Sequence, residues 1–258
     1  MKKRRILSLC LVAAIAAIAV FAGTLAYFTD TDEADNTFTV GNVKIDLIEQ
    51  ERAYDNEGNA TGLQDFTGGK LLMPIVGSAQ GEKETVDGVE MPTAKNYVDK
   101  IISIKNTGES KAYVRVFVAV PTALQNGEVP NAPLYDVLHW NFNADSTAEG
   151  EWTDEIVVAN PTVIDGVEYK IYSRTYTTAL AADEATATPA YIGFYLDKSV
   201  DYNGESWTVD FGTGTQAIDY DLSEGVNIPV FAQAIQADGF ESAEDAFAAS
   251  GLPSNPWA

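Results

Sequence analysis

Apolar and polar residues alternate with a period of two along much of this chain, and this pattern constrains the fold more than any other feature. The residues from Val43 to Leu47 alternate in this way, and so do those from Val114 to Val120. Successive side chains of a β-strand point to opposite faces of its sheet, so this alternation is typical of a half-buried strand. The pattern predicts that the chain is built mainly from strands.

Turn residues separate further strand-like segments. Val98–Lys105 leads into Asn106-Thr107-Gly108, which indicates a turn between this strand and the one that contains Val114 to Val120. The strongest local signal is Asp165-Gly166, which joins Val163-Ile164 to Val167–Tyr176 as a hairpin with a two-residue turn. Three more strands are predicted, the last with Pro229 marking an edge or a bulge: Tyr191–Leu196, Trp207–Phe211 and Val226–Ile235.

Helix signals are scarce outside the N-terminal segment. Ser242–Asp245 has the form of an N-terminal capping box, which opens onto Ala246–Ala249 and is followed by Gly251. Many short strands with almost no alternation of strand and helix predict an all-β fold, an antiparallel β-sandwich resembling a jelly roll with long loops. We expect one domain over 27–258, in which 49–96 is a loop-rich surface excursion that could hold a small hairpin.

The N-terminus has the features of a secretory signal. A basic cluster, Lys2–Arg5, precedes an apolar run from Ile6 to Ala22, and Thr24-Leu25-Ala26 supplies small residues two apart. We predict a signal helix over 1–26 that is cleaved between Ala26 and Tyr27 by a signal peptidase. The alternative is an uncleaved membrane anchor. Either interpretation predicts export, so the protein should be secreted to the extracellular matrix or the cell surface.

The formal charge of the chain is strongly negative. It is −22 for all 258 residues, and cleavage after Ala26 would leave 232 residues with 12 of the 16 basic residues against 38 acidic ones, a charge of −26. Such a surface repels phosphate groups, so we expect neither nucleic acid nor anionic lipid headgroups as partners. Better partners for such a surface are cations, cationic polymers or further copies of the chain. The single cysteine, Cys10, would leave with the signal, and no disulfide would remain.

Residues for enzymatic chemistry are sparse. His139 is the only histidine, which leaves a zinc hydrolase without its usual set of His ligands. A Ser-His-Asp triad needs one histidine only, but the chain has no GxSxG motif and His139 sits in a strand-like segment. We therefore expect no catalytic residues. The tryptophans Trp140, Trp152 and Trp207 could form a sugar-stacking face, although their strand-like surroundings favour a place in the core.

The acidic stretch Asp30–Asn36 resembles a calcium loop only superficially. Its sixth position is not Gly, its twelfth is Gly41 rather than Glu, and Ala34 replaces an oxygen ligand. We interpret it as a solvated acidic spacer. No cofactor or metal site is predicted beyond weak surface binding of calcium.

Three segments carry a resemblance to a known family. TLAYFTDTDEADNTFTVGNVKIDL resembles the junction of proteins exported through the SipW-type signal peptidase of Gram-positive bacteria. YVDKIISIKNTGESKAYVRVFVAV is similar to the first paired strands of the TasA and CalY (camelysin) family, and VFAQAIQADGFESAEDAFAA looks like the final strand and helix of relatives in that group. Together these segments cover about a quarter of the chain.

The resemblance implies a jelly-roll subunit of an extracellular biofilm-matrix fibre, with itself and other matrix components as partners. In this family, fibres can form when the N-terminal strand of one subunit completes the sheet of its neighbour. Carried over by position, the donor segment would contain Tyr27, Phe28, Thr37, Phe38 and Val40. The same segment could instead be an ordinary first strand of its own subunit.

Two functions of other classes remain open at this stage. The first is a secreted metallopeptidase, as which camelysin relatives have been catalogued, although the single histidine disfavours it. The second is an adhesin or glycan-binding module.

Overall fold

The computed structural model describes residues 27–28, 37–40, 43–70, 72–125, 136–141, 151–158, 161–212 and 214–257. The predicted signal, Ala26 and the acidic stretch 30–36 lie outside the described residues. Within those ranges, no helix has the length and apolar character that crossing a membrane requires.

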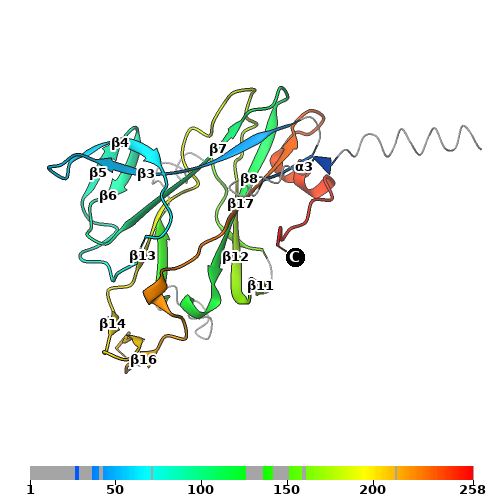
Figure 1. The fold of residues 1–258 in the computed structure, drawn as a ribbon. Coiled ribbons are helices and arrows are strands. Elements are labelled where there is room, and N and C mark those ends of the chain that lie inside the picture. The colour runs from blue at the N-terminus through cyan, green and yellow to red at the C-terminus, as the bar shows by residue number, and fades with distance from the viewer. Residues whose placement is uncertain are drawn as a thin grey trace, which may run out of the picture.

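Among the described residues, the fold is an all-β sandwich with one short α-helix, as the alternation predicted (Figure 1). Four sheets are present in the described residues, and two of them form the main layers. The seven-stranded sheet has the order β1-β2-β17-β8-β12-β10, with β11 also paired to β12, and the five-stranded sheet has the order β4-β3-β7-β13-β9. A three-stranded sheet, β14-β15-β16, and the hairpin β5-β6 complete the fold.

The strands of the seven-stranded sheet are β1 (Tyr27–Phe28), β2 (Thr37–Val40), β8 (Ala112–Pro121), β10 (Ile156–Val157), β11 (Thr162–Ile164), β12 (Val167–Thr175) and β17 (Val230–Gln236). Those of the five-stranded sheet are β3 (Ile45–Tyr54), β4 (Ala60–Asp65), β7 (Val98–Asn106), β9 (Leu138–Asn141) and β13 (Tyr191–Leu196). The smaller sheets contain β5 (Lys83–Val86), β6 (Val89–Pro92), β14 (Val200–Tyr202), β15 (Trp207–Val209) and β16 (Gln216–Ala217). The helices are η1 (Thr122–Leu124), η3 (Leu222–Glu224) and α3 (Ala243–Ala249).

The main core lies between the two large sheets. Alternate residues of β8 face inward, and they meet inward residues of β7 and β13 from the opposite layer. The members that are fully or almost fully buried include Val114, Val116, Val118, Ile102, Ile104, Phe194 and Leu196. Burying a side chain of this size stabilises the fold by about 1.5–3 kcal/mol. Packing of this kind can replace disulfides in holding the sandwich together.

Several local predictions are confirmed. The hairpin at Asp165-Gly166 forms with Ile164 opposite Val167, and both turn residues have positive φ, 50° and 84°. These angles fit a type I′ turn, which favours Asp-Gly for this reason. Ser242 caps α3, because its side chain accepts a hydrogen bond from the backbone N–H of Asp245. The final strand differs from its prediction: it runs from Val230 to Gln236 between β2 and β8, so Pro229 precedes it and marks neither an edge nor a bulge within it. Proline lacks the N–H that a strand paired on both sides needs.

One resemblance-based expectation is wrong. The segments Val98–Asn106 and Ala112–Pro121 are strands joined by a turn, but they do not pair with each other: β7 pairs with β3 and β13, whereas β8 pairs with β12 and β17. The turn carries the chain from one sheet to the other. Gly108 allows this, because a Cβ there would lie 2.6 Å from the backbone nitrogen of Lys44.

The segment 49–96, expected to be a surface excursion, contains three complete strands as well as the end of β3. β4 joins the five-stranded sheet, and β5 and β6 form a hairpin. A second hydrophobic cluster fills the space beneath them and includes Met91, which is fully buried. Apolar residues are infrequent along this segment, so its sequence does not predict that they form a second hydrophobic cluster.

Candidate functional site at the sheet edge

The predicted donor segment forms the edge of the seven-stranded sheet. Tyr27 and Phe28 make up β1, and Thr37, Phe38 and Val40 lie in β2. β1 pairs antiparallel with β2, with Tyr27 opposite Val40, and β2 pairs with β17. In this structure, therefore, the segment completes the sheet of its own chain.

The ladder between β2 and β17 is parallel. Thr37, Thr39 and Val40 lie opposite Ala232, Ala234 and Ile235, respectively. The other ladders of this sheet are antiparallel among the described residues. A parallel pair cannot be closed by a tight turn, and almost the whole chain separates these two strands. No local connection therefore ties β2 to the β17 of its own subunit.

Without β1 and β2, strand β17 would be an open edge. It is well anchored on its other side, where seven consecutive residues, Val230–Gln236, pair with β8. Its inward residues Ala232 and Ala234 are fully buried. An exposed edge of this kind presents a row of unpaired backbone groups that can bind another strand. The structure thus combines a well-paired acceptor strand with a partner strand that no tight turn joins to it, although residues 41–44 connect β2 directly to β3 of its own subunit.

The opposite edge of the same sheet carries exposed apolar side chains. Ile156 and Val157 of β10 are 59% and 53% exposed, and Val163 of β11 is 65% exposed. Neither strand was singled out as an edge by the sequence, because alternation does not tell which strand lies outermost.

The residues considered for catalysis do not come together. His139 lies in β9, where its ring stacks on Tyr195 and its Nε2 is 3.3 Å from Oδ2 of Asp197. In the described part of the chain, no Ser hydroxyl joins this pair. The described part of the chain also holds no group of three His, Cys, Asp or Glu side chains that could bind a metal ion.

A carboxylate with a raised pKa lies between the layers. Glu155 accepts hydrogen bonds from the Tyr191 hydroxyl at 2.7 Å and from the Trp140 indole nitrogen at 3.0 Å. Burial raises the pKa of Glu155, and the hydrogen bonds from Tyr191 and Trp140 only partly oppose that effect. The group links β9 and β13 to the segment before β10, so its evident role is to join the two sheets.

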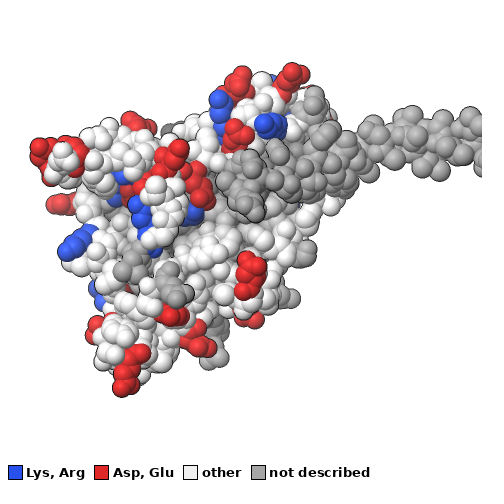
Figure 2. All heavy atoms as spheres, viewed as in Figure 1, with Lys and Arg blue, Asp and Glu red and all other residues white. Residues whose placement is uncertain are grey.

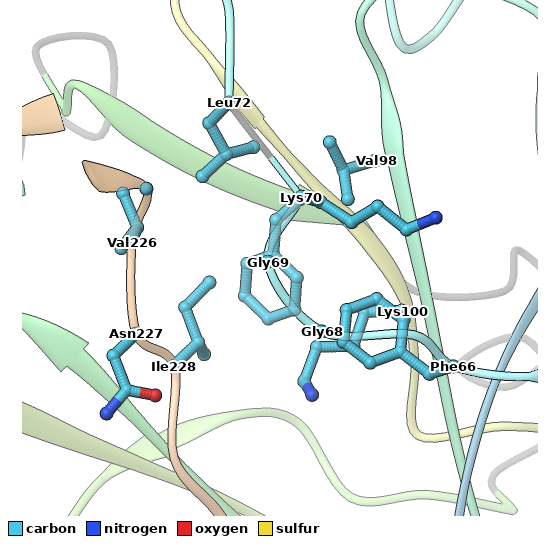
Figure 3. A pocket seen from close by; sticks show the side chains of 12 residues that line it. Phe66, Gly68, Gly69, Lys70, Leu72, Val98, Lys100, Val226, Asn227 and Ile228 are labelled. Atoms are coloured by element: carbon cyan, nitrogen blue, oxygen red, sulfur yellow. The ribbon is translucent and has the colours of Figure 1, made fainter. Parts of the chain in front are cut away.

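A hollow of about 280 Å³ lies between the loop after β4 and the segment before β17. In Figure 3, Val226, Asn227 and Ile228 lie on one side of it and Phe66 and Lys100 on the other. Its two lysines already have carboxylate partners: Lys70 pairs with Glu51 at 2.9 Å, and Lys100 with Glu49 at 2.8 Å. Neither lysine is thus left to attract an anion.

The three tryptophans considered for sugar stacking are dispersed. Trp152 is buried against Tyr176, and Trp140 packs edge-on against Tyr172, so both belong to the core. Trp207 lies directly opposite Tyr202 in the β14–β15 hairpin, with ring centroids 5.4 Å apart. Tyr202 is 52% exposed, and the two rings line a hollow of about 690 Å³ together with Glu205, Asp219, Asp221 and other residues.

No family model, curated protein or solved structure matches this chain.

Proposed function

We propose that this protein is an exported structural subunit of the biofilm matrix or cell surface, which assembles with copies of itself into fibres. In this proposal the chain is cleaved after Ala26, and the segment Tyr27–Val40 of one copy pairs with β17 of the next. The observation that carries the proposal is the parallel ladder between β2 and β17 at the sheet edge. The function needs no catalytic group, metal or cofactor.

The β2–β17 ladder can form between two copies as well as within one. β2 from a second copy would form the same backbone hydrogen bonds with β17 in the same register. Exchange therefore costs no ladder contacts, and each subunit that gives its segment away receives one from a neighbour. Such head-to-tail contacts extend into a filament when the rotation between subunits does not close a ring.

Two properties of the sequence support the proposal. The N-terminal junction resembles that of proteins exported through the SipW-type signal peptidase, and the central and closing segments resemble the TasA and CalY family, which points to an exported matrix subunit. The large negative charge also suits a protein whose copies remain separate until salt or acid weakens their repulsion.

Cross-linking can distinguish exchange from pairing within one chain. Thr39 and Ala234 face each other in the β2–β17 ladder. In a mature chain starting at Tyr27, which has no other cysteine, Thr39→Cys with Ala234→Cys should give a link within one chain while the protein is monomeric. After assembly, oxidation should instead give a covalent ladder on a denaturing gel.

A matched pair provides the control. Val114 faces Ala234 in the β8–β17 ladder, which lies inside one subunit in either state. Oxidation of Val114→Cys with Ala234→Cys should therefore never link two chains, so no multimer bands should appear on the denaturing gel. Fibres in which the Thr39 pair stays within one chain would rule out strand exchange. Absence of any polymer over a wide range of salt and pH would contradict the structural role itself.

A second candidate function, glycan binding, is favoured by the exposed corner that Tyr202 and Trp207 form beside the hollow at β14–β16. Aromatic faces with nearby carboxylates suit the stacking and hydrogen bonding of a sugar. Figure 2 shows acidic side chains at the end of the molecule where Figure 1 places these strands. Binding of the soluble domain to a glycan array, lost in Tyr202→Ala and kept in the equally exposed Tyr54→Ala, would support this function.

A further inference from the structure

A polar row crosses the outer face of the seven-stranded sheet. Gln233 of β17 lies opposite Arg115 of β8, and Arg115 lies opposite Thr175 of β12. Thr153 continues the row, because its hydroxyl accepts a hydrogen bond from the backbone N–H of Thr175 at 3.0 Å. The neighbouring outward residues Phe117 and Ile171 are apolar and almost fully buried. The row therefore forms a polar floor beside these apolar residues.

This floor lies in a groove of about 630 Å³ beside α3. The helix contributes Ala243, Phe247 and Ala248, and the segment after it contributes Leu252 and Ser254. Ile156, at the open edge of the sheet, lines the other side and is 59% exposed. The groove thus has mainly apolar walls that also include Glu244, with hydroxyls and one cation at its base.

Arg115 is that cation, and its contacts within the described residues do not include a carboxylate. Its Nε donates to Oε1 of Gln233 at 2.7 Å, and its Nη2 donates to the carbonyl oxygen of Pro253 at 3.3 Å. The guanidinium also stacks against Phe247 at 4.3 Å and Phe117 at 5.0 Å from the ring centroids. These contacts hold it in place, while the third nitrogen, Nη1, has no acceptor in the described part of the protein.

Arg115 has no carboxylate partner in the described residues, although acidic residues outnumber basic ones by 38 to 16 in this chain. Exposed lysines such as Lys95, Lys111 and Lys198 also have none, but water solvates them, whereas Arg115 is half-buried. Arg52, Lys70, Lys83 and Lys100 are all paired with carboxylates. Burial lowers the pKa of Arg115 to about 10, and no neighbouring charge opposes that effect. Placing an anion beside the guanidinium would relieve this cost.

We infer that this groove is a binding site for a carboxylate that carries a short apolar chain. The carboxylate would accept hydrogen bonds from Nη1 of Arg115 and from the hydroxyls of Thr153 or Thr175. The chain would lie against Phe247, Leu252 and Ile156. The planar guanidinium fork suits a carboxylate, and the apolar side chains suit the chain attached to it. The site is independent of the proposed strand exchange.

One carboxylate of the protein weakens this interaction. Glu244, in the first turn of α3, lines the same groove and is exposed. It would repel a bound carboxylate through solvent, which should reduce the affinity by about twofold to threefold. Glu241 is also exposed, lies three residues earlier and does not line the groove, so it serves as a matched position.

The test uses octanoate as the probe and octan-1-ol as its neutral counterpart, with the mature chain. Calorimetry should show binding of octanoate and not of octan-1-ol, and the NMR signal of the Arg115 Nε–H group should shift on titration. Arg115→Gln should lose roughly tenfold or more in affinity, the size expected for a charge-assisted hydrogen bond. Glu244→Gln should gain about twofold to threefold, and Glu241→Gln should not change it.

A second set of titrations distinguishes a fatty-acid carboxylate from the carboxylate at the end of a peptide. N-acetylleucine, compared with N-acetylleucinamide, represents a carboxylate at the end of a peptide, and tighter binding than octanoate would assign the site to peptide termini. The inference is overturned if both carboxylates fail to bind at concentrations up to about 10 mM. It is also overturned if octan-1-ol binds as well as octanoate, or if Glu244→Gln and Glu241→Gln behave alike. The Glu244 comparison remains valid even where Arg115→Gln impairs folding.

Discussion

Arg52 and Asp99 form a buried bidentate ion pair that joins β3 to β7. Nε of Arg52 donates to Oδ2 of Asp99 at 2.7 Å, and Nη2 donates to Oδ1 at 2.7 Å. The remaining nitrogen, Nη1, donates to Glu84 of β5 at 2.6 Å. The pair therefore fixes the β5–β6 hairpin on the five-stranded sheet as well.

Breaking this pair should be costly. Asp99→Ala would leave the guanidinium of Arg52, which is only 6% exposed, without its main counter-ion. We expect a loss of about 3–5 kcal/mol in the free energy of unfolding, the usual effect of an uncompensated buried charge. Denaturant titration measures this, with Asp65→Ala at an exposed position as the control. A loss below about 1 kcal/mol would show that water replaces the partner.

The pH dependence of stability should report on Glu155. Its pKa is raised in the folded protein from an ordinary value of 4.5, because burial disfavours the charged form. Its contribution to stability is therefore fully present below the unfolded pKa and is lost as the pH rises through the folded pKa. Glu155→Gln stays neutral, so its stability relative to the unmodified protein should improve between about pH 4 and pH 7. A constant difference across that range would contradict the raised pKa.

Gly193 should tolerate no side chain. A Cβ at this position of β13 would lie 2.4 Å from the carbonyl oxygen of Val98 and 2.5 Å from the ring of Tyr97. Gly193→Ala should therefore lower the free energy of unfolding by about 1–3 kcal/mol, as overpacking in a core does. Gly68→Ala is the control, since nothing lies within 4 Å of a Cβ there. Equal stabilities in thermal unfolding would show that β7 and β13 can move apart.

Assembly of the mature chain should depend on charge. Copies with a formal charge of −26 should repel each other at neutral pH and low salt. At physiological ionic strength the screening length is about 8 Å, so salt should promote assembly, and acid near the sequence pI of 4.2 should do so by protonating carboxylates.

Light scattering and negative-stain microscopy measure this dependence. A chain that begins at Gly41 lacks β1 and β2 and should stay monomeric under all these conditions. Fibres that form best at neutral pH without salt would contradict the charge argument. Fibres of equal length from the shorter chain would contradict the role of the N-terminal strands.

The sequence by itself determined the local structure. Alternation located β3, β7, β8, β12 and β13 but not β4, β5 and β6. Asp165-Gly166 specified its turn through the positive φ that both residues adopt, and Ser242 specified the start of α3. These features depend on residues a few positions apart, whose interactions are the same in any fold. The sequence also marked Tyr27–Val40 as a segment with strand-forming residues, although its pairing partner was a hypothesis based on a resemblance.

The tertiary structure alone decided which strands became neighbours. β7 and β8 follow each other in the chain yet lie in different sheets, and β2 pairs with β17 from the other end of the protein. Strand order depends on which apolar faces pack best across the whole core, and a period of two is the same for every candidate partner. For the same reason the sequence could not single out Arg115 among its basic residues. Only the packing of α3 over β8 places this arginine in a groove where its own hydrogen bonds go to Gln233 and Pro253 rather than to a carboxylate.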